Sequence, residues 1–256
     1  MEKADYNKIA RSYDEGRFLS EQNIDLWIGL ILKYARAAEG ARLLDLGCGT
    51  GRFSIPIAEK LRFLVTGADS SPDMLDIARQ KDKNRIVNWE VRDAQYLNYP
   101  DASFDVIFMS HLLHHCDDPR KVINDCWRIL DERGAILIRY GAIEQIRDDV
   151  EHTFFPETLA IDEARGFTVK KTESYLKDAG FSDVVSEEIT QQTYATSTDH
   201  FKAVTMKSTS VLTMIPPDAF ARGIGRFQKY IDRDPDDPWL LHDKMTITAG
   251  YKRRKL

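Results

Sequence analysis

The pattern of apolar and polar positions changes period repeatedly along the middle of the chain. Short apolar runs that end at a polar residue are typical of buried parallel strands. The segments between them carry apolar residues three or four positions apart, as on one face of a helix. Five such runs begin at Leu43, Leu61, Ile86, Phe104 and Ala135. Strands that alternate with helices from Leu43 to Tyr140 predict an α/β fold with a doubly wound parallel sheet.

Turn residues mark several of the expected helices in this region. A helix is predicted from Arg52 to Leu61, and another begins close to Pro72, which suits a first helical turn. A third, amphipathic helix is predicted from Arg120 to Leu130. We expect Gly134 to cap its carboxyl end, with the fifth strand starting at Ala135.

The two ends of the chain predict further elements around this sheet. A long amphipathic helix is expected from Asn23 to Ala38, before the first strand. After the fifth strand we expect a helical segment broken at Pro156, a helix that ends at Gly180, and two more strands. The expected bounds are 143–165 for the broken segment, 167–181 for the helix, 184–193 for the sixth strand and 244–251 for an antiparallel seventh strand.

A long insertion separates the last two strands. It covers residues 197–238 and contains two helix-like stretches, 200–214 and 218–230. A simple connection between neighbouring strands needs only a few residues, so an insertion of this length is usually functional. We expect it to cover the carboxyl edge of the sheet as a substrate cap; a dimer interface is the alternative. The expected organisation is residues 1–38, a core of 39–196 with 239–256, and the insertion 197–238.

Three glycines follow the first strand at alternate positions: Gly47, Gly49 and Gly51. Glycine allows positive φ and lets a ligand approach the backbone closely. A dinucleotide-binding turn would place its third glycine at position 52, but position 52 is arginine. A ligand-free turn is the alternative. The second strand ends at Asp69, where this architecture places an acid against a ribose diol, and a helix N-cap is the alternative role for Asp69.

The segment from Leu43 to Gly51 resembles motif I of the class I S-adenosylmethionine (SAM)-dependent methyltransferases. The resemblance implies a Rossmann-like seven-stranded sheet with helices on both faces. It also implies that Asp45 holds the methionine part of SAM, that the glycine turn passes under the ribose and amino-acid portion, and that Asp93 and Ala94 meet the adenine. A solvated turn is the alternative for Asp93. The implied cofactor-binding residues are Tyr13, Asp45, Gly47, Cys48, Gly49, Gly51, Asp69, Ser70, Met74, Asp93, Ala94 and Ser110.

The N-terminal segment carries a second resemblance. Tyr6, Ala10, Tyr13 and Asp14 match the Y-x-x-x-A-x-x-Y-D opening of many small-molecule methyltransferases. In that family this opening forms a lid over the cofactor, so residues 1–38 are expected to form a helical lid. Packing of two tyrosines on one helix face is the alternative.

A histidine-rich string follows the fourth strand. Residues 110–119 resemble the corresponding region of the ubiquinone/menaquinone-type methyltransferases. We expect His111 to be the catalytic base, since it comes one residue after the strand end, at the sheet edge where ligands bind. His114 and His115 would point about 100° apart on a helix, so we expect at most one in the pocket. Capping or local packing is the alternative for each histidine, and no ligand set for a metal completes the cluster.

Composition limits the remaining classes of function. A net charge of −5 in 256 residues argues against nucleic acid as a substrate. Three cysteines without metal-like spacing predict reduced thiols and a cytoplasmic protein. No apolar run approaches the ~18 residues that a membrane span needs. The composition leaves monomer and homodimer open.

Together these observations predict a methyltransferase that moves the methyl group of SAM to a small organic acceptor by in-line displacement and releases S-adenosylhomocysteine. The Asn/Asp-Pro-Pro-Tyr signature of amide and base N-methylation is absent after the fourth strand. We therefore expect an oxygen, a sulfur or an activated carbon as the reacting atom. A SAM-fold binding or regulatory protein without turnover is the alternative.

Overall fold

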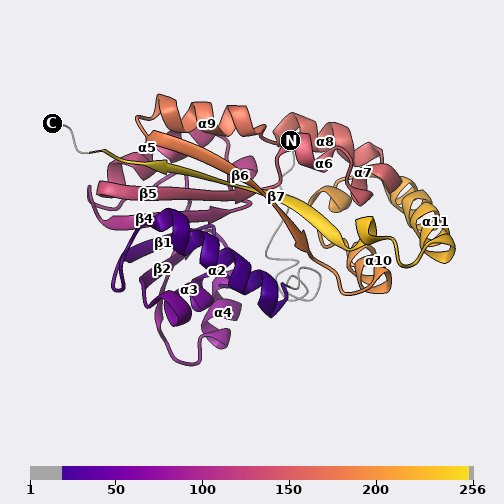
Figure 1. The fold of residues 1–256 in the computed structure, drawn as a ribbon, viewed down its shortest axis with the longest axis horizontal. Helices are drawn as coiled ribbons and strands as arrows, with labels where there is room; N and C mark the ends of the chain where they lie inside the picture. The colour runs from indigo at the N-terminus through magenta and orange to yellow at the C-terminus, as the bar shows by residue number, and fades with distance from the viewer. Residues whose placement is uncertain (1–18, 254–256) are drawn as a thin grey trace.

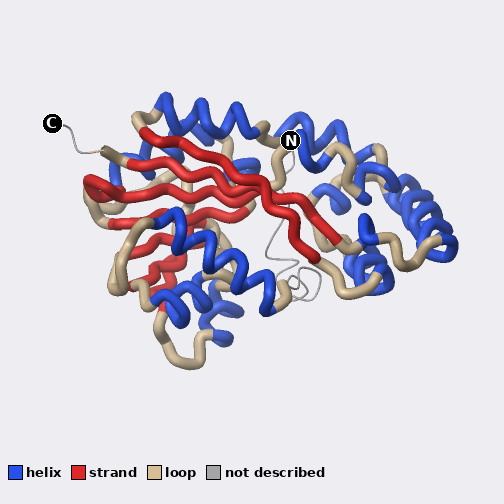
Figure 2. Tube along the Cα trace, in the orientation of Figure 1, coloured by secondary structure: helices blue, strands red, loops and turns tan. Residues whose placement is uncertain are grey.

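A seven-stranded mixed sheet forms the centre of the protein in the computed structural model, which describes residues 19–253 (Figures 1 and 2). The strand order is β3-β2-β1-β4-β5-β7-β6, and β7 runs antiparallel to both of its neighbours. The predicted fold class is confirmed. The strands are β1 Arg42–Leu46, β2 Leu64–Asp69, β3 Val87–Val91, β4 Phe104–Ser110, β5 Leu130–Tyr140, β6 Ser182–Gln192 and β7 His242–Tyr251.

Helices cover both faces of the sheet because successive residues of each buried strand point to opposite faces. On one face, α2 (Glu21–Ala35) and α3 (Ser54–Leu61) share an apolar core with alternate residues of β1 and β4. On the other face, α5 (Pro119–Ile129) and α9 (Val169–Asp178) pack against the intervening residues. The helix α4 (Pro72–Lys81) lies against β2 and β3.

One predicted boundary is wrong. The chain enters β5 at Leu130, directly after α5, so Gly134 lies inside the strand and does not cap a helix. A β-carbon at position 134 would lie 3.0 Å from the backbone oxygen of Asp105, and this close approach accounts for the glycine. A glycine next to charged residues looks like a helix end in the sequence, and only strand pairing shows its other role.

A helical lobe extends beyond the carboxyl edge of the sheet (Figure 1). It combines two segments far apart in the sequence, the connection after β5 and the insertion between β6 and β7. Their apolar residues form one cluster, in which Phe154 and Phe155 meet Phe227 and Leu212. The elements of this helical lobe are α6 Ile143–Ile146, α7 Val150–Phe154, α8 Glu157–Arg165, α10 Ser197–Thr205, η2 Val211–Thr213, α11 Pro217–Arg233 and η3 Pro238–Leu240.

The helices of the helical lobe are shorter and more often interrupted than the sequence predicted. The segment 143–165 breaks at Pro156 as expected, but also before α7, where the carboxylate of Asp149 accepts a hydrogen bond from the Glu151 N–H. The predicted helix 200–214 ends at Thr205 and resumes as η2. Among residues 19–253, no helix combines the length and low polarity that crossing a bilayer requires.

Candidate functional site

The glycine turn has the backbone that its spacing predicted. Gly47, Gly49 and Gly51 all have positive φ, at 73°, 55° and 75°. A β-carbon at Gly51 would lie 2.4 Å from the Trp89 ring, whereas one at Gly49 would meet nothing within 4 Å. Gly51 is therefore required for packing against β3, and Gly49 leaves open space where a ligand can approach the backbone.

Two acids lie at this turn, Asp45, which is buried, and Asp69, which is half-buried. The Ser54 hydroxyl donates to Asp45 Oδ2 at 2.5 Å, and burial raises the pKa of Asp45 to about 7. Asp69 accepts from the Gly49 N–H at 2.8 Å and from the Ser71 N–H at 2.9 Å, while burial raises its pKa. Ser71, not Asp69, is the N-cap of α4. Asp69 thus links the glycine turn to the start of α4.

The other residues assigned to the cofactor lie along neighbouring strand ends. Ser70 and Asp93 are exposed, just after β2 and β3, whereas Met74 and Ala94 are buried. The Asp93 carboxylate accepts from the Gln95 N–H at 2.8 Å, a turn arrangement that leaves its second oxygen for another donor. Tyr13 and the N-terminal lid lie outside the described residues, so their roles stay predictions.

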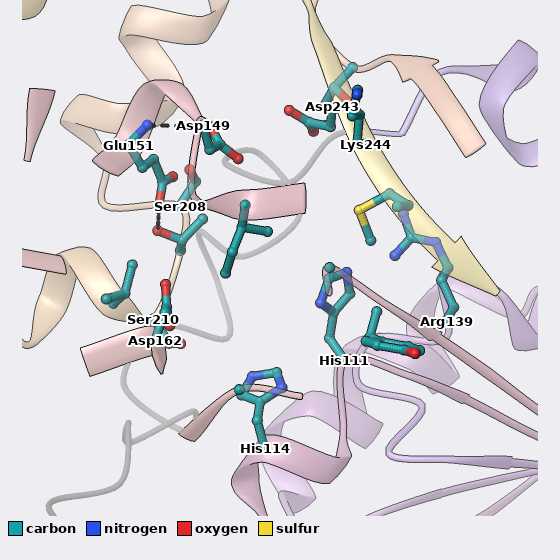
Figure 3. Close-up of a pocket in the computed structure, with 18 of the residues that line it drawn as sticks. His111, His114, Arg139, Asp149, Glu151, Asp162, Ser208, Ser210, Asp243 and Lys244 are labelled. Atoms are coloured by element: carbon teal, nitrogen blue, oxygen red, sulfur yellow. Dashed lines mark hydrogen bonds between the residues drawn. The ribbon is translucent and has the colours of Figure 1, made fainter. Parts of the chain in front are cut away.

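A cavity of about 220 Å³ lies between the sheet edge and the helical lobe (Figure 3). His111 and His114 line it and His115 does not, so one of the two adjacent histidines faces the cavity, as expected. Arg52, the residue after Gly51, also lines the cavity and joins it to the glycine turn. Of the predicted site residues within the described part of the chain, His111 is the one that lines this cavity.

Arg139 is a residue of this site that the sequence analysis missed. It is 3% exposed at the end of β5, and its Nη1 donates to Ser110 Oγ at 3.1 Å. Its guanidinium lies 4.4 Å from the centre of the Trp27 ring. A cation inside the apolar run of β5 was the signal that could have identified it, because a buried charge is costly without a specific role.

Two carboxylates of the cavity wall were also missed. Asp149 comes from the start of α7 and Asp243 from β7, and Figure 3 shows their carboxylates directed toward each other. The Thr193 hydroxyl donates to Asp243 at 2.6 Å. Burial, together with the charge of Asp243, raises the pKa of Asp149 to about 7. Neither acid belongs to a recognisable motif, so spacing alone could not single them out.

The wall on the side of the helical lobe is polar and internally paired. Asp162 forms an ion pair with Arg165 at 2.8 Å, and Arg165 donates to Ser210 at 3.0 Å. His200 is 4% exposed, with Nδ1 2.6 Å from the Leu240 carbonyl oxygen, and burial lowers its pKa to about 4. Among residues 19–253, no group of three or more His, Cys, Asp or Glu could hold a metal ion.

Comparison with known proteins finds a methyltransferase domain in this chain. Residues 44–138 match the family described as "Methyltransferase domain". Phosphoethanolamine N-methyltransferase 1 of Arabidopsis thaliana is 32% identical over 60% of this chain and 31% of its own length. A ubiquinone/menaquinone biosynthesis C-methyltransferase of Bdellovibrio bacteriovorus is 27% identical over 66% of this chain and 74% of its own length.

A solved structure shows the same fold. It contains Haemonchus contortus phosphoethanolamine N-methyltransferase 2 with phosphomonomethylethanolamine and S-adenosylhomocysteine, and it matches 97% of this chain and 58% of that chain with a TM-score of 0.67 at 21% identity. The chain spans about a third of the length of the plant relatives that it matches. Residues 44–138 match a methyltransferase domain, and the strand order of the sheet is that of the class I SAM-dependent methyltransferase fold.

Proposed function

We propose that this protein transfers the methyl group of SAM to a small organic acceptor bound in the cavity beneath the helical lobe. The observation that carries the proposal is the junction at Arg52, which borders both the glycine turn and the cavity. A cofactor held over the turn would therefore lie beside the cavity. His111 lies in the same cavity, at the end of β4.

The residues of the turn suit SAM. The open space at Gly49 admits a ligand to the backbone. Asp69, which accepts from the Gly49 N–H, is the acceptor we assign to the ribose hydroxyls, and Asp45 is the one we assign to the ammonium group. SAM supplies an electrophilic methyl group on a sulfonium. The protein then has mainly to hold the acceptor atom in line with that group and to exclude water.

We assign the base role to His111 and expect an oxygen, a sulfur or an activated carbon as the reacting atom. A base is required only where the acceptor atom is protonated in its resting form. His114 also lines the cavity and its ring centre lies 6.3 Å from that of His111. It is the competing candidate for the same role.

We further propose that the helical lobe acts as a substrate cap. Residues from α7, α8 and α10 line the cavity opposite the sheet edge, which favours a covering role over a dimer interface.

The three cysteines, Cys48, Cys116 and Cys126, are free thiols, in keeping with the reducing cytoplasm expected from the sequence.

Incubation with methyl-labelled SAM and a fractionated small-molecule extract tests the proposal. We expect S-adenosylhomocysteine to form together with a labelled small molecule. SAM binding without either product would support the alternative, a SAM-binding protein without turnover. A His111→Asn variant that binds SAM normally and forms far less product would place the reaction at this cavity.

A further inference from the structure

Two carboxylates face each other across the cavity from different parts of the fold. Asp149 belongs to the helical lobe and Asp243 to the sheet, and 94 residues separate them in the chain. Figure 3 shows both side chains directed into the space between the helical lobe and β7. The cavity therefore has an acidic end, formed where its two walls meet.

The other charged groups of the cavity already have ionic or hydrogen-bonding partners. Asp162 pairs with Arg165 at 2.8 Å, and Glu151 accepts from the Thr209 hydroxyl at 2.7 Å. Lys244, next to Asp243, points to Glu188, with its Nζ 3.5 Å from a carboxylate oxygen. Within residues 19–253, Asp149 and Asp243 have no cationic side chain within ion-pair distance. Their partners are the Glu151 N–H and the Thr193 hydroxyl.

Arg139 is the cation of the cavity that influences Asp243, but it is directed elsewhere. Its charge and that of His242 favour ionised Asp243. Arg139 nevertheless donates to Ser110 and lies over Trp27, on the β4 side of the cavity. The acidic end is thus left with two facing carboxylates whose mutual repulsion and burial both disfavour ionisation.

Like charges in a partly dry cavity are destabilising unless a bound proton or a cationic ligand compensates for them. A protonated amine compensates for these charges, because each of its N–H groups can donate to a carboxylate oxygen and its positive charge offsets the negative charges of the two acids. An anionic group at the same position would be repelled. A neutral hydroxyl could donate one hydrogen bond but would leave the charge uncompensated.

We propose that the acidic end of the cavity binds a protonated amine of the methyl acceptor, with Asp149 and Asp243 as its hydrogen-bond acceptors. That an amine binds here follows from the two acids alone. That this amine belongs to the methyl acceptor rests on the proposed function. His111 projects from the end of β4, apart from the two acids (Figure 3). The amine is therefore the group by which the acceptor is recognised, and the reacting atom lies at the His111 side.

Three probes of equal length and different charge test this selectivity: n-hexylamine, 1-hexanol and hexanoate. Their affinities for the protein are measured by calorimetry at neutral pH in the presence of S-adenosylhomocysteine. We expect hexylammonium to bind about 10-fold or more tightly than hexanol, as charge-assisted hydrogen bonds exceed neutral ones. Hexanoate should bind most weakly. Equal affinity for the amine and the alcohol would overturn the proposal.

The variant Asp149→Asn/Asp243→Asn should lose the preference for the amine and bind hexylamine and hexanol alike. Asparagine at 149 keeps an oxygen that can accept from the Glu151 N–H, so the start of α7 is preserved. Asp148→Asn is the matched control, since Asp148 is exposed and lies outside the cavity. The same loss in the Asp148 variant would overturn the assignment, and melting curves identify any variant that is not folded.

The test of amine binding can fail or succeed independently of the test of methyl transfer. An amine preference that disappears in the double variant would support this inference even if no S-adenosylhomocysteine forms in turnover assays. Methyl transfer to an acceptor without an amine, in a protein that shows no preference for hexylammonium, would support the proposed function and refute the inference.

Discussion

The glycine turn after β1 and the cavity beneath the helical lobe adjoin at Arg52, but the chain builds them differently. The turn and the acid beneath it come from one stretch of sequence, Asp45 to Gly51, with a second acid from the next strand. The cavity wall comes from the segment after β4, from β5, β6 and β7, and from two separate helical segments. A site encoded in one continuous segment carries a recognisable motif, whereas a site assembled from distant segments does not.

The same contrast appears in the chemistry of the two regions. The turn offers open space beside its backbone at Gly49, which suits the close approach of a cofactor. The cavity offers two facing carboxylates, a buried arginine and four histidines, which suit a particular acceptor. We therefore expect substitutions in the two regions to separate cofactor binding from turnover.

The largest effect is expected at the boundary of the two regions. His111→Asn removes the proposed base while keeping a residue that tolerates the φ of 55° at this position. Methyl transfer to an acceptor that needs deprotonation should fall about 10²- to 10⁴-fold. SAM affinity, measured by calorimetry, should change little. His114→Asn is the control, and a larger loss of turnover in that variant would move the base role to His114.

The second prediction tests whether the helical lobe is a separate unit of stability. Phe227 is fully buried there and stacks on Phe154 with ring centres 4.9 Å apart. Phe227→Ala should cost about 3–5 kcal/mol, the usual range for a buried aromatic ring. Hydrogen exchange should show this loss in α7, α10 and α11, with SAM affinity retained. Phe108→Ala, in the sheet core, is the comparison and should weaken both regions together.

Acid should weaken the helical lobe through His200. Its pKa is about 4 in the folded protein and 6.5 when unperturbed, so the unfolded chain binds the proton more readily. This contribution to stability is fully present above pH 6.5 and is lost as the pH falls toward 4, by about 3 kcal/mol at most. His200→Asn, which can still donate to the Leu240 carbonyl, should flatten the pH dependence of thermal unfolding over that window.

The glycine turn should respond to pH in the opposite direction. The pKa of Asp45 is raised from 3.8 to about 7, so the folded state holds the proton more strongly. Stability from this group is present below pH 3.8 and is lost as the pH rises through 7. Asp45→Asn should make the ligand-free protein more stable at pH 8 relative to pH 5. A steeper decline toward pH 8 in this variant would contradict the assignment.

The smallest effect concerns the ribose. Asp69→Ala removes the proposed acceptor for the ribose hydroxyls and should weaken SAM binding by about 1.5–3 kcal/mol, the range for hydrogen bonds to charged groups. Calorimetry measures the loss, with the exposed Asp73→Ala on α4 as the control. Unchanged affinity in a folded Asp69 variant would refute the ribose assignment. Amine selectivity at Asp149 and Asp243 should be unaffected, which would separate the two regions further.

The motif-bearing half of the protein was predictable because its interactions are local. The apolar runs indicated the first five strands, and the three glycines indicated where the chain can adopt positive φ, as it does at positions 47, 49 and 51. Asp45, next to the last residue of β1, and Asp69, the last residue of β2, were found for the same reason, since parallel strands end at a common edge of the sheet. The prediction that Gly134 caps a helix was wrong, because a glycine among charged residues resembles a helix end and only strand pairing shows that it lies inside β5.

The cavity could be known only from the tertiary structure. The sequence by itself determined the sheet, the turn and the presence of helices after β5 and before β7. It could not show that Phe154 and Phe227, 73 residues apart, pack into one cluster, because apolar residues on two amphipathic helices do not specify each other as partners. That packing brings Asp149 opposite Asp243 and beside the edge that carries His111. The physical reason is that hydrophobic burial is non-directional, so the choice of partners follows from the whole fold.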